Sequence, residues 1–176
     1  MIHEVREVNK KMMIVAAAAM IIDQITKAIA VAKLSLNVPV KIISNFFYLT
    51  LCNNEGAAWG LFKNARFIIV IGTIAAIILI YHYILCFKQN LRNNIAFGFL
   101  LGGLAGNLID RMIFGYVRDF FDFYIFKYDY PVFNFADIFI VIGVLLLIIA
   151  IIKGEDKNDN NSEGKQSRKS RQVPSE

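Results

Sequence analysis

The sequence contains few of the residue types that build disulfide frameworks, zinc sites and hydroxyl-based catalytic triads. It has two histidines, His3 and His82, and two cysteines, Cys52 and Cys86. No CxxC pair and no Cys/His spacing typical of a zinc site occurs. The apolar pattern of the chain puts the two cysteines on opposite sides of a membrane, so the sequence indicates no disulfide.

Charge is also scarce relative to apolar surface. Only 19% of the 176 residues are charged, whereas 57% are hydrophobic, and the mean hydropathy is +0.52. This excludes an ordinary soluble domain. Four apolar stretches of about 20 residues are long enough to cross a bilayer as helices, in which the backbone satisfies its own hydrogen bonds. They cover residues 12–32, 67–87, 95–114 and 136–152.

The sequence therefore predicts an all-α membrane protein with four transmembrane helices in one domain, residues 1–152. The first stretch has the basic start of a signal peptide, but Asp23 and Lys27 within it favour an uncleaved helix. With both termini in the cytoplasm, eleven Lys and Arg residues lie on the inner side and six on the outer side. The positive-inside rule favours this orientation.

The connections between the helices differ in character. In residues 36–62, apolar and polar residues alternate with a period of two, which predicts a small extracytoplasmic β-sheet. Residues 115–134 are rich in Phe and Tyr, so we expect an interfacial loop or helix there. Residues 153–176 are charged and polar, which is typical of a disordered cytoplasmic tail.

A Ser-His-Asp triad cannot form on the outer side, because its serines, Ser35 and Ser44, have no histidine near them in this topology. Carboxylates must then perform any hydrolysis there. Asp119 and Asp137 lie at the outer ends of neighbouring helices, where charge is costly and usually functional. They predict a dyad that shares one proton. Alternatively, Asp119 is a solvated loop residue and Asp137 a charge favoured by the helix dipole.

Other polar residues lie near this outer boundary, and each has a structural alternative. Asn134 can share a helix face with Asp137 or cap the fourth helix, and the two roles are compatible. The third helix carries Asn107, Asp110 and Arg111 on one face, so Arg111 pairs with a dyad carboxylate or a phosphate, or it snorkels beside Asp110.

Two further features of the membrane helices favour structural roles. Asp23 and Lys27 have the i, i+4 spacing of an ion pair, with substrate positioning as the alternative. Gly98, Gly102 and Gly106 form a GxxxGxxxG pattern, which indicates a close-packing seam.

Five motifs in order resemble those of the bacterial lipoprotein signal peptidase (signal peptidase II) family. They are DQITK (Asp23 to Lys27), NEGAAWG (Asn54 to Gly60), GNLIDR (Gly106 to Arg111), GYVRDF (Gly115 to Phe120) and FNFAD (Phe133 to Asp137). The resemblance extends from about residue 10 to residue 152. Arg118 stands where the family usually has an apolar residue, and the charged tail is no part of the family pattern.

The resemblance implies a membrane aspartyl endopeptidase that removes signal peptides from diacylglyceryl-modified prolipoproteins, cleaving before the lipidated cysteine. Asp119 and Asp137 match the catalytic aspartates of the family. Positions that line its site or are characteristically polar match Asn54, Gly56, Asn107, Arg111, Asn134, Asp23, Lys27 and Asp110. We expect membrane lipids as partners, no nucleic acid, no cofactor, no metal and a monomeric state.

Two other functions use comparable residues. A small proton-coupled transporter also needs intramembrane carboxylates, but it would distribute charges across the depth of the bilayer. A metal-dependent phospholipid hydrolase could use Asp119, Asp122 and Asp129 with Mg²⁺ or Ca²⁺. Sensitivity to a chelator distinguishes this last possibility from an aspartyl dyad.

Overall fold

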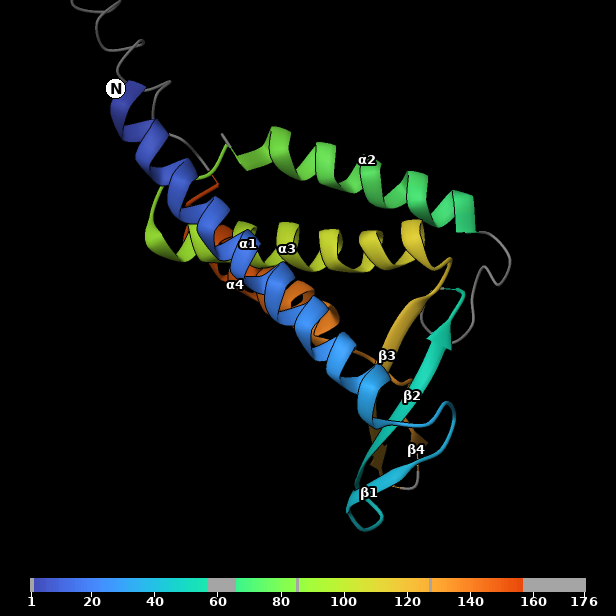
Figure 1. Cartoon of the computed structure of the whole chain (residues 1–176). Coiled ribbons are helices and arrows are strands. Elements are labelled where there is room, and N and C mark those ends of the chain that lie inside the picture. Colours follow the sequence, from blue (N-terminus) through green and yellow to red (C-terminus); the bar gives the residue numbers. More distant parts are fainter. Residues whose placement is uncertain (1, 57–65, 85, 127, 157–176) are drawn as a thin grey trace, which may run out of the picture.

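The computed structural model describes residues 2–56, 66–84, 86–126 and 128–156 (Figure 1). It contains the helices α1 (Ile2–Lys33), α2 (Arg66–Ile84), α3 (Leu91–Ile113) and α4 (Phe135–Ile152). Residues Lys10–Lys33 of α1 and the whole of the other three are long and apolar enough to cross a membrane. The prediction of four transmembrane helices is confirmed.

Helix α3 is the centre of the bundle, and it packs against α1, α2 and α4. Glycines of α3 allow close approaches of the backbones of α1 and α4. A Cβ atom added at Gly102 would lie 2.5 Å from the carbonyl oxygen of Ala16 in α1, and one at Gly103 would lie 2.5 Å from that of Ala136 in α4. Gly98 also faces α1, so the predicted glycine seam brings two backbones into contact.

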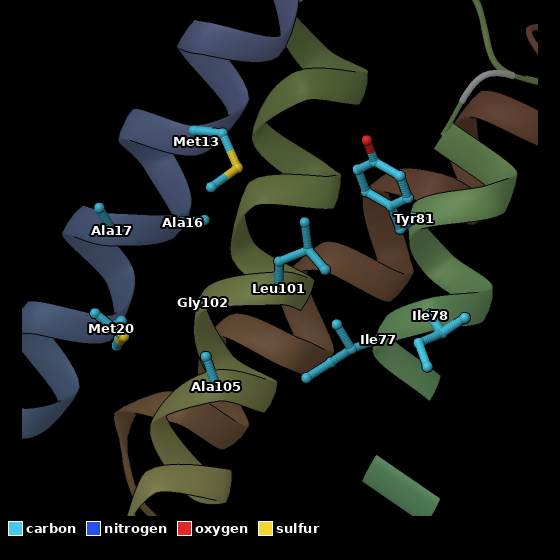
Figure 2. Close-up of a pocket in the computed structure, with 10 residues that line it drawn as sticks. All are labelled: Met13, Ala16, Ala17, Met20, Ile77, Ile78, Tyr81, Leu101, Gly102 and Ala105. Atoms are coloured by element: carbon cyan, nitrogen blue, oxygen red, sulfur yellow. The ribbon is translucent and has the colours of Figure 1, made fainter. Parts of the chain in front are cut away.

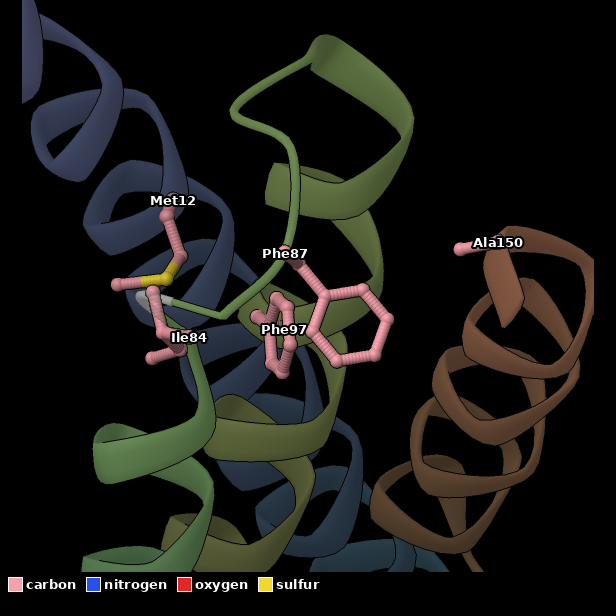
Figure 3. Close-up of a cluster of buried hydrophobic side chains, with 5 residues drawn as sticks. All are labelled: Met12, Ile84, Phe87, Phe97 and Ala150. Atoms are coloured by element: carbon pink, nitrogen blue, oxygen red, sulfur yellow. The ribbon is translucent and has the colours of Figure 1, made fainter. Parts of the chain in front are cut away.

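The β-sheet lies beyond the C-terminal end of α1, at what we call the sheet end of the bundle (Figure 1). A cluster of apolar side chains closes the opposite end (Figure 3). Phe87 and Phe97 meet there edge to face, with ring centroids 5.2 Å apart. Met12 of α1, Ile84 of α2 and Ala150 of α4 complete the cluster, which joins all four helices.

Helix α2 leaves a cavity of about 490 Å³ between itself, α1 and α3 (Figure 2). Small residues of α3, Gly102 and Ala105, lie at its back, while Met20 of α1 and Ile77 of α2 lie on its two sides. Its other lining residues are Met13, Ala16, Ala17, Ile78, Tyr81 and Leu101. The cavity is therefore almost wholly apolar and runs along the membrane-spanning part of the bundle.

The sheet is antiparallel, with the strands β1 (Val40–Ile43), β2 (Phe47–Asn54), β3 (Val117–Ile125) and β4 (Tyr128–Asp129) in that order. Strands β1 and β2 confirm the sheet predicted in residues 36–62, of which 57–62 lie outside the described residues.

The interfacial loop or helix predicted in residues 115–134 is wrong for Val117–Ile125, which forms β3. Aromatic residues of this strand pair with β2, Phe123 with Phe47 and Phe121 with Leu49. Aromatic and β-branched residues suit such cross-strand pairs. The partner strand lies far away in the chain, so no local pattern revealed it.

The start of the predicted tail is held against the bundle. Residues 153–156 form a turn in which the Glu155 carboxylate pairs with Arg92 and accepts a 2.8 Å hydrogen bond from Asn90. Asn90 also caps α3 by accepting from the backbone N–H of Asn93 at 2.9 Å. The remainder of the predicted tail, 157–176, lies outside the described residues.

Candidate active site

Two carboxylates converge where the helix bundle meets the sheet. Asp119 lies in β3 and is 2% exposed. Asp137 lies in the first turn of α4 and is half-buried. Strand β3 brings Asp119 to the N-terminal end of α4 because its backbone also bonds the segment before that helix, with Phe121 donating to the carbonyl oxygen of Phe133 at 2.8 Å.

Asn134 joins the two carboxylates. Its Nδ2 donates to Asp119 Oδ1 at 2.6 Å, and its Oδ1 accepts from the backbone N–H of Asp137 at 3.1 Å. The backbone N–H of Asn134 in turn donates to Asp137 Oδ2 at 3.1 Å, which completes a capping box. Asn134 thus takes the capping role considered in the sequence. Its extended backbone lies outside α4, so it does not share a helix face with Asp137, yet it contacts both aspartates.

Asn107 of α3 extends this network to the other side of Asp137. Its Nδ2 donates to Asp137 Oδ1 at 2.8 Å, while its Oδ1 accepts from Lys27 Nζ at 2.9 Å and from Asn134 Nδ2 at 3.1 Å. An amide with donors on one side and an acceptor on the other has only one favourable orientation. The Lys27 ammonium, together with the Asn134 amide, therefore sets the direction in which Asn107 faces Asp137.

The end of β2 contributes the second donor to Asp119. Asn54 Nδ2 donates to Asp119 Oδ2 at 2.9 Å, and Asn54 Oδ1 accepts from the backbone N–H of Gly56 at 3.0 Å. Arg111 of α3 donates to the Gly56 carbonyl oxygen at 3.0 Å. Asn54, Gly56 and Arg111 thus form a chain of contacts along one side of Asp119. Residues 57–60 of the corresponding sequence motif lie outside the described residues.

A second polar layer lies deeper in the helices. Lys27 Nζ is 2.8 Å from Asp23 Oδ2 and 3.5 Å from Asp110 Oδ2, and all three side chains are fully buried. The predicted Asp23–Lys27 ion pair is confirmed. Asp23 Oδ1 also accepts from the backbone N–H of Ala136 at 3.0 Å, so α1 supports the N-terminal end of α4 directly.

Sequence reasoning did not include Gln24 and Arg118 in this layer. Gln24 Nε2 donates to Asp23 and to Asp110, each at 3.1 Å, and Arg118 makes a two-point contact with Asp110. Gln24 lies in α1, but its partner Asp110 lies in α3, and Arg118 lies in a strand whose partner strand is far away in the chain. No local signal in the sequence pointed to either residue.

Burial gives Asp119 an unusual affinity for a proton. Removal from solvent, reinforced by the nearby charge of Asp137, raises the pKa of Asp119 from 3.8 to about 7. The hydrogen bonds from Asn54 and Asn134 oppose this increase, because they stabilise the charged carboxylate. Burial also raises the pKa of the Cys52 thiol, and Asp119 adds to that effect.

The arrangement can hold one proton between two carboxylates near neutral pH. In such a pair, the charged member can accept a proton from water while the protonated member polarises a carbonyl group. Among the residues that the structure describes, no three His, Cys, Asp or Glu side chains are grouped so that they could hold a metal ion.

Comparison with known proteins identifies relatives along most of the chain. A family profile described as signal peptidase (SPase) II matches residues 15–153, a span that includes every candidate residue. The lipoprotein signal peptidase of Staphylococcus haemolyticus is 40% identical over 148 residues, which cover 84% of this chain and 94% of that protein. That of Staphylococcus carnosus is 39% identical and covers 78% of this chain and 87% of its own length.

Solved structures agree with these relatives. A bacterial membrane enzyme determined at 2.3 Å resolution superposes with a TM-score of 0.73 and is 36% identical, covering 81% of this chain and 87% of that one. A second structure, at 1.9 Å resolution, has a TM-score of 0.71 and covers 92% of its own chain.

The pKa of Asp119 provides a test of the site that does not depend on any activity. Asn54→Ala should raise it by about 1 pKa unit, because the charged carboxylate loses a hydrogen bond of ~1.5 kcal/mol. Asp137→Asn should lower it, because the neighbouring negative charge is removed. Titration of ¹³C-labelled aspartate carboxyl groups by NMR measures both. Thr50→Val, which removes a bond to Asp122, is the control. Equal values in all variants would contradict this electrostatic account.

Proposed function

We propose that Asp119 and Asp137 are the catalytic pair of this chain, which belongs to the signal peptidase II family. The chain is an aspartic-type lipoprotein signal peptidase of the membrane, and its substrates are prolipoproteins. The resemblance seen in the sequence is confirmed, and it sets aside the transporter and the phospholipid hydrolase. The observation that supports the pair is the bridge from Asn134 to both carboxylates.

The two carboxylates have different surroundings, which suggests how they divide the work. Asp119 is deeply buried, and its pKa of about 7 suits it to hold the shared proton at neutral pH. Asp137 accepts hydrogen bonds from Asn107 and from the backbone N–H of Asn134, the residue that caps α4. Asp137 itself lies in the first turn of that helix, where the helix dipole favours negative charge.

The bond cleavage then follows from this division. Asp137 takes a proton from a water molecule, whose oxygen attacks the carbonyl carbon of the scissile peptide bond. Asp119 donates its proton to the carbonyl oxygen, which gives a neutral tetrahedral diol. When the diol collapses, the C–N bond breaks, the leaving nitrogen takes a proton from Asp137, and a diol hydroxyl returns its proton to Asp119.

We further propose that the substrate carries a diacylglyceryl group on the cysteine that follows the cleaved bond. The pair lies where the transmembrane helices end, a position that an acyl-anchored cysteine reaches without leaving the bilayer surface. The acyl chains restrict the substrate to this level and so remove much of the entropy cost of alignment.

The apolar cavity between α1, α2 and α3 suits the apolar segment of the signal peptide (Figure 2). Met20 lies one helical turn from the Asp23–Lys27 layer, so the cavity runs from below the site into the bundle. Gly102 and Ala105 at its back have little or no side chain, which permits a peptide helix to approach α3 closely.

The Lys and Arg distribution supports cytoplasmic termini and a site near the outer leaflet of a bacterial inner membrane. The described hydrogen-bond donors to the two carboxylates, Asn54, Asn107 and Asn134, belong to the same chain as the pair, which supports a monomer as the active form.

A cleavage assay with purified protein tests the catalytic pair and the lipid requirement together. Asp119→Asn and Asp137→Asn should each lower cleavage of a diacylglyceryl prolipoprotein by ~10²-fold or more, because each removes half of the proton exchange. The unlipidated substrate should be cleaved by the unaltered protein ~10²-fold more slowly, since it lacks the second attachment to the membrane.

Thermal unfolding in detergent checks that both variants are folded. Near-normal turnover by either variant would refute the assignment of Asp119 and Asp137 as the catalytic pair. Equal rates for the two substrates would overturn the lipid requirement alone, and loss of activity with a chelator would indicate a metal-dependent reaction.

Filling the cavity should impair substrate binding more than chemistry. Ala17→Trp should raise KM about tenfold, equivalent to ~1.4 kcal/mol, and leave kcat within about twofold. Ala18→Trp is the matched control, because Ala18 is also exposed but lies about 100° further around α1. Similar KM values for the two variants would exclude this cavity as the peptide site.

Cysteine labelling tests the orientation. In a cysteine-free background, Ile125→Cys should react with an impermeant thiol reagent in intact spheroplasts, whereas Lys153→Cys should react only after permeabilisation. Both positions are exposed in the structure, so access is limited by the membrane. The reverse pattern would invert the topology.

A further inference from the structure

We propose that Arg118 is a positioning residue, which neutralises Asp110 so that the Lys27 ammonium remains directed at Asn107 and, through it, at Asp137. This inference rests on the proposed function of the Asp119–Asp137 pair. It adds a residue that makes no described contact with either carboxylate and acts through three intermediate groups.

Asp110 is fully buried, and most of its hydrogen bonds come from Arg118. Arg118 Nη2 lies 2.7 Å from Asp110 Oδ1 and Nε lies 3.1 Å from Oδ2, which is the two-point geometry of a strong guanidinium–carboxylate pair. The backbone N–H of Arg118 donates to the same Oδ2 at 3.0 Å. Asp110 therefore anchors the strand residue that immediately precedes Asp119.

Other contacts hold the guanidinium in place and leave it little freedom. Arg118 Nη2 also donates to Gln24 Oε1 at 2.9 Å, and the group lies over the Phe114 ring, 4.6 Å from its centroid. The residue is 9% exposed. The guanidinium therefore satisfies both oxygens of Asp110, including Oδ2, the oxygen that Lys27 approaches.

Lys27 has three possible partners, and its distances show which it favours. Nζ is 2.8 Å from Asp23, 2.9 Å from Asn107 and 3.5 Å from Asp110. A fully charged carboxylate normally attracts an ammonium more strongly than a neutral amide does. The longest distance is nevertheless to Asp110, which is the carboxylate that Arg118 already neutralises.

The charges of this layer balance. Asp23 and Asp110 contribute two negative charges, Lys27 and Arg118 contribute two positive charges, and Gln24 bridges the anions without charge. Loss of Arg118 alone leaves Asp110 buried with an uncompensated charge, which draws Lys27 away from Asn107. Asn107 Oδ1 then keeps only the neutral donor Asn134, so its orientation is held less firmly and its hydrogen bond to Asp137 weakens.

Steady-state cleavage of diacylglyceryl prolipoprotein tests the inference. Arg118→Met should lower kcat at least tenfold and change KM less than twofold, because the reacting groups are disturbed and the cavity is not. Arg118→Lys, which retains the cation, should keep at least a third of kcat. The decisive variant combines Arg118→Met with Asp110→Asn, which restores neutrality, and it should recover most of the lost kcat.

A purely structural role predicts the opposite for the double variant, since both partners of a buried contact are lost and activity falls at least as far as in Arg118→Met. That result would overturn the inference, as would unchanged kcat in Arg118→Met. If Arg118→Met does not fold, the double variant decides alone. A kcat above a tenth of the unaltered value supports the inference, and a kcat below a tenth of it overturns the inference.

Arg66→Met is the matched control. Arg66 donates to a backbone carbonyl of α3 at the sheet end, at 3.0 Å from Met112 O, but lies outside the charged layer. Its kcat should be unchanged. Absence of cleavage by the unaltered protein would refute the proposed function itself, and so the two failures are distinguishable.

Discussion

The rest of the site depends on the contacts that surround the buried ammonium of Lys27. A charge taken out of water costs several kcal/mol unless close partners compensate for it. Here the partners come from different parts of the chain, Asp23 from α1 and both Asn107 and Asp110 from α3. The need to surround one cation therefore aligns two helices, and Asn107 carries that alignment to Asp137 at the start of α4.

The proposed catalytic pair, Asp119 and Asp137, occupies the boundary between two environments. The transmembrane helices supply a low-dielectric side, which favours a neutral Asp119. The ends of β2 and α4 supply amide and backbone donors, which favour a charge on the same pair. Burial alone would make the pair hold its proton too tightly, and hydrogen-bond donors alone would make it release the proton. In the mechanism that we propose, the two effects together keep a shared proton available near neutral pH.

Packing of the bundle serves the same end. The glycines of α3 bring its backbone against α1 and α4, so the polar side chains of three helices are within hydrogen-bonding distance of one another. Helix α2 is packed less closely, and the resulting cavity offers room for an apolar ligand without disturbing the polar layer. Tight contacts thus hold the polar network together, whereas the looser contact leaves the space that we propose for the signal peptide.

The sequence by itself determined the helices, because the length and hydropathy of an apolar stretch decide whether it crosses a membrane. It also indicated the two aspartates, since charge at the edge of such a stretch is costly and therefore informative. The Asp23–Lys27 pair followed from helical periodicity, because its partners are one turn apart.

Tertiary structure decided what depended on pairing between distant segments. Strand β3 exists because β2 lies beside it, and an aromatic segment without a known partner is equally suited to a membrane interface. Arg118 and Gln24 acquire their roles only when β3 and α1 meet at Asp110. Local propensity depends on residues that are close in the sequence, whereas hydrogen bonds and ion pairs depend on residues that are close in space. Only the fold brings residues that are distant in the sequence within a few ångströms of one another.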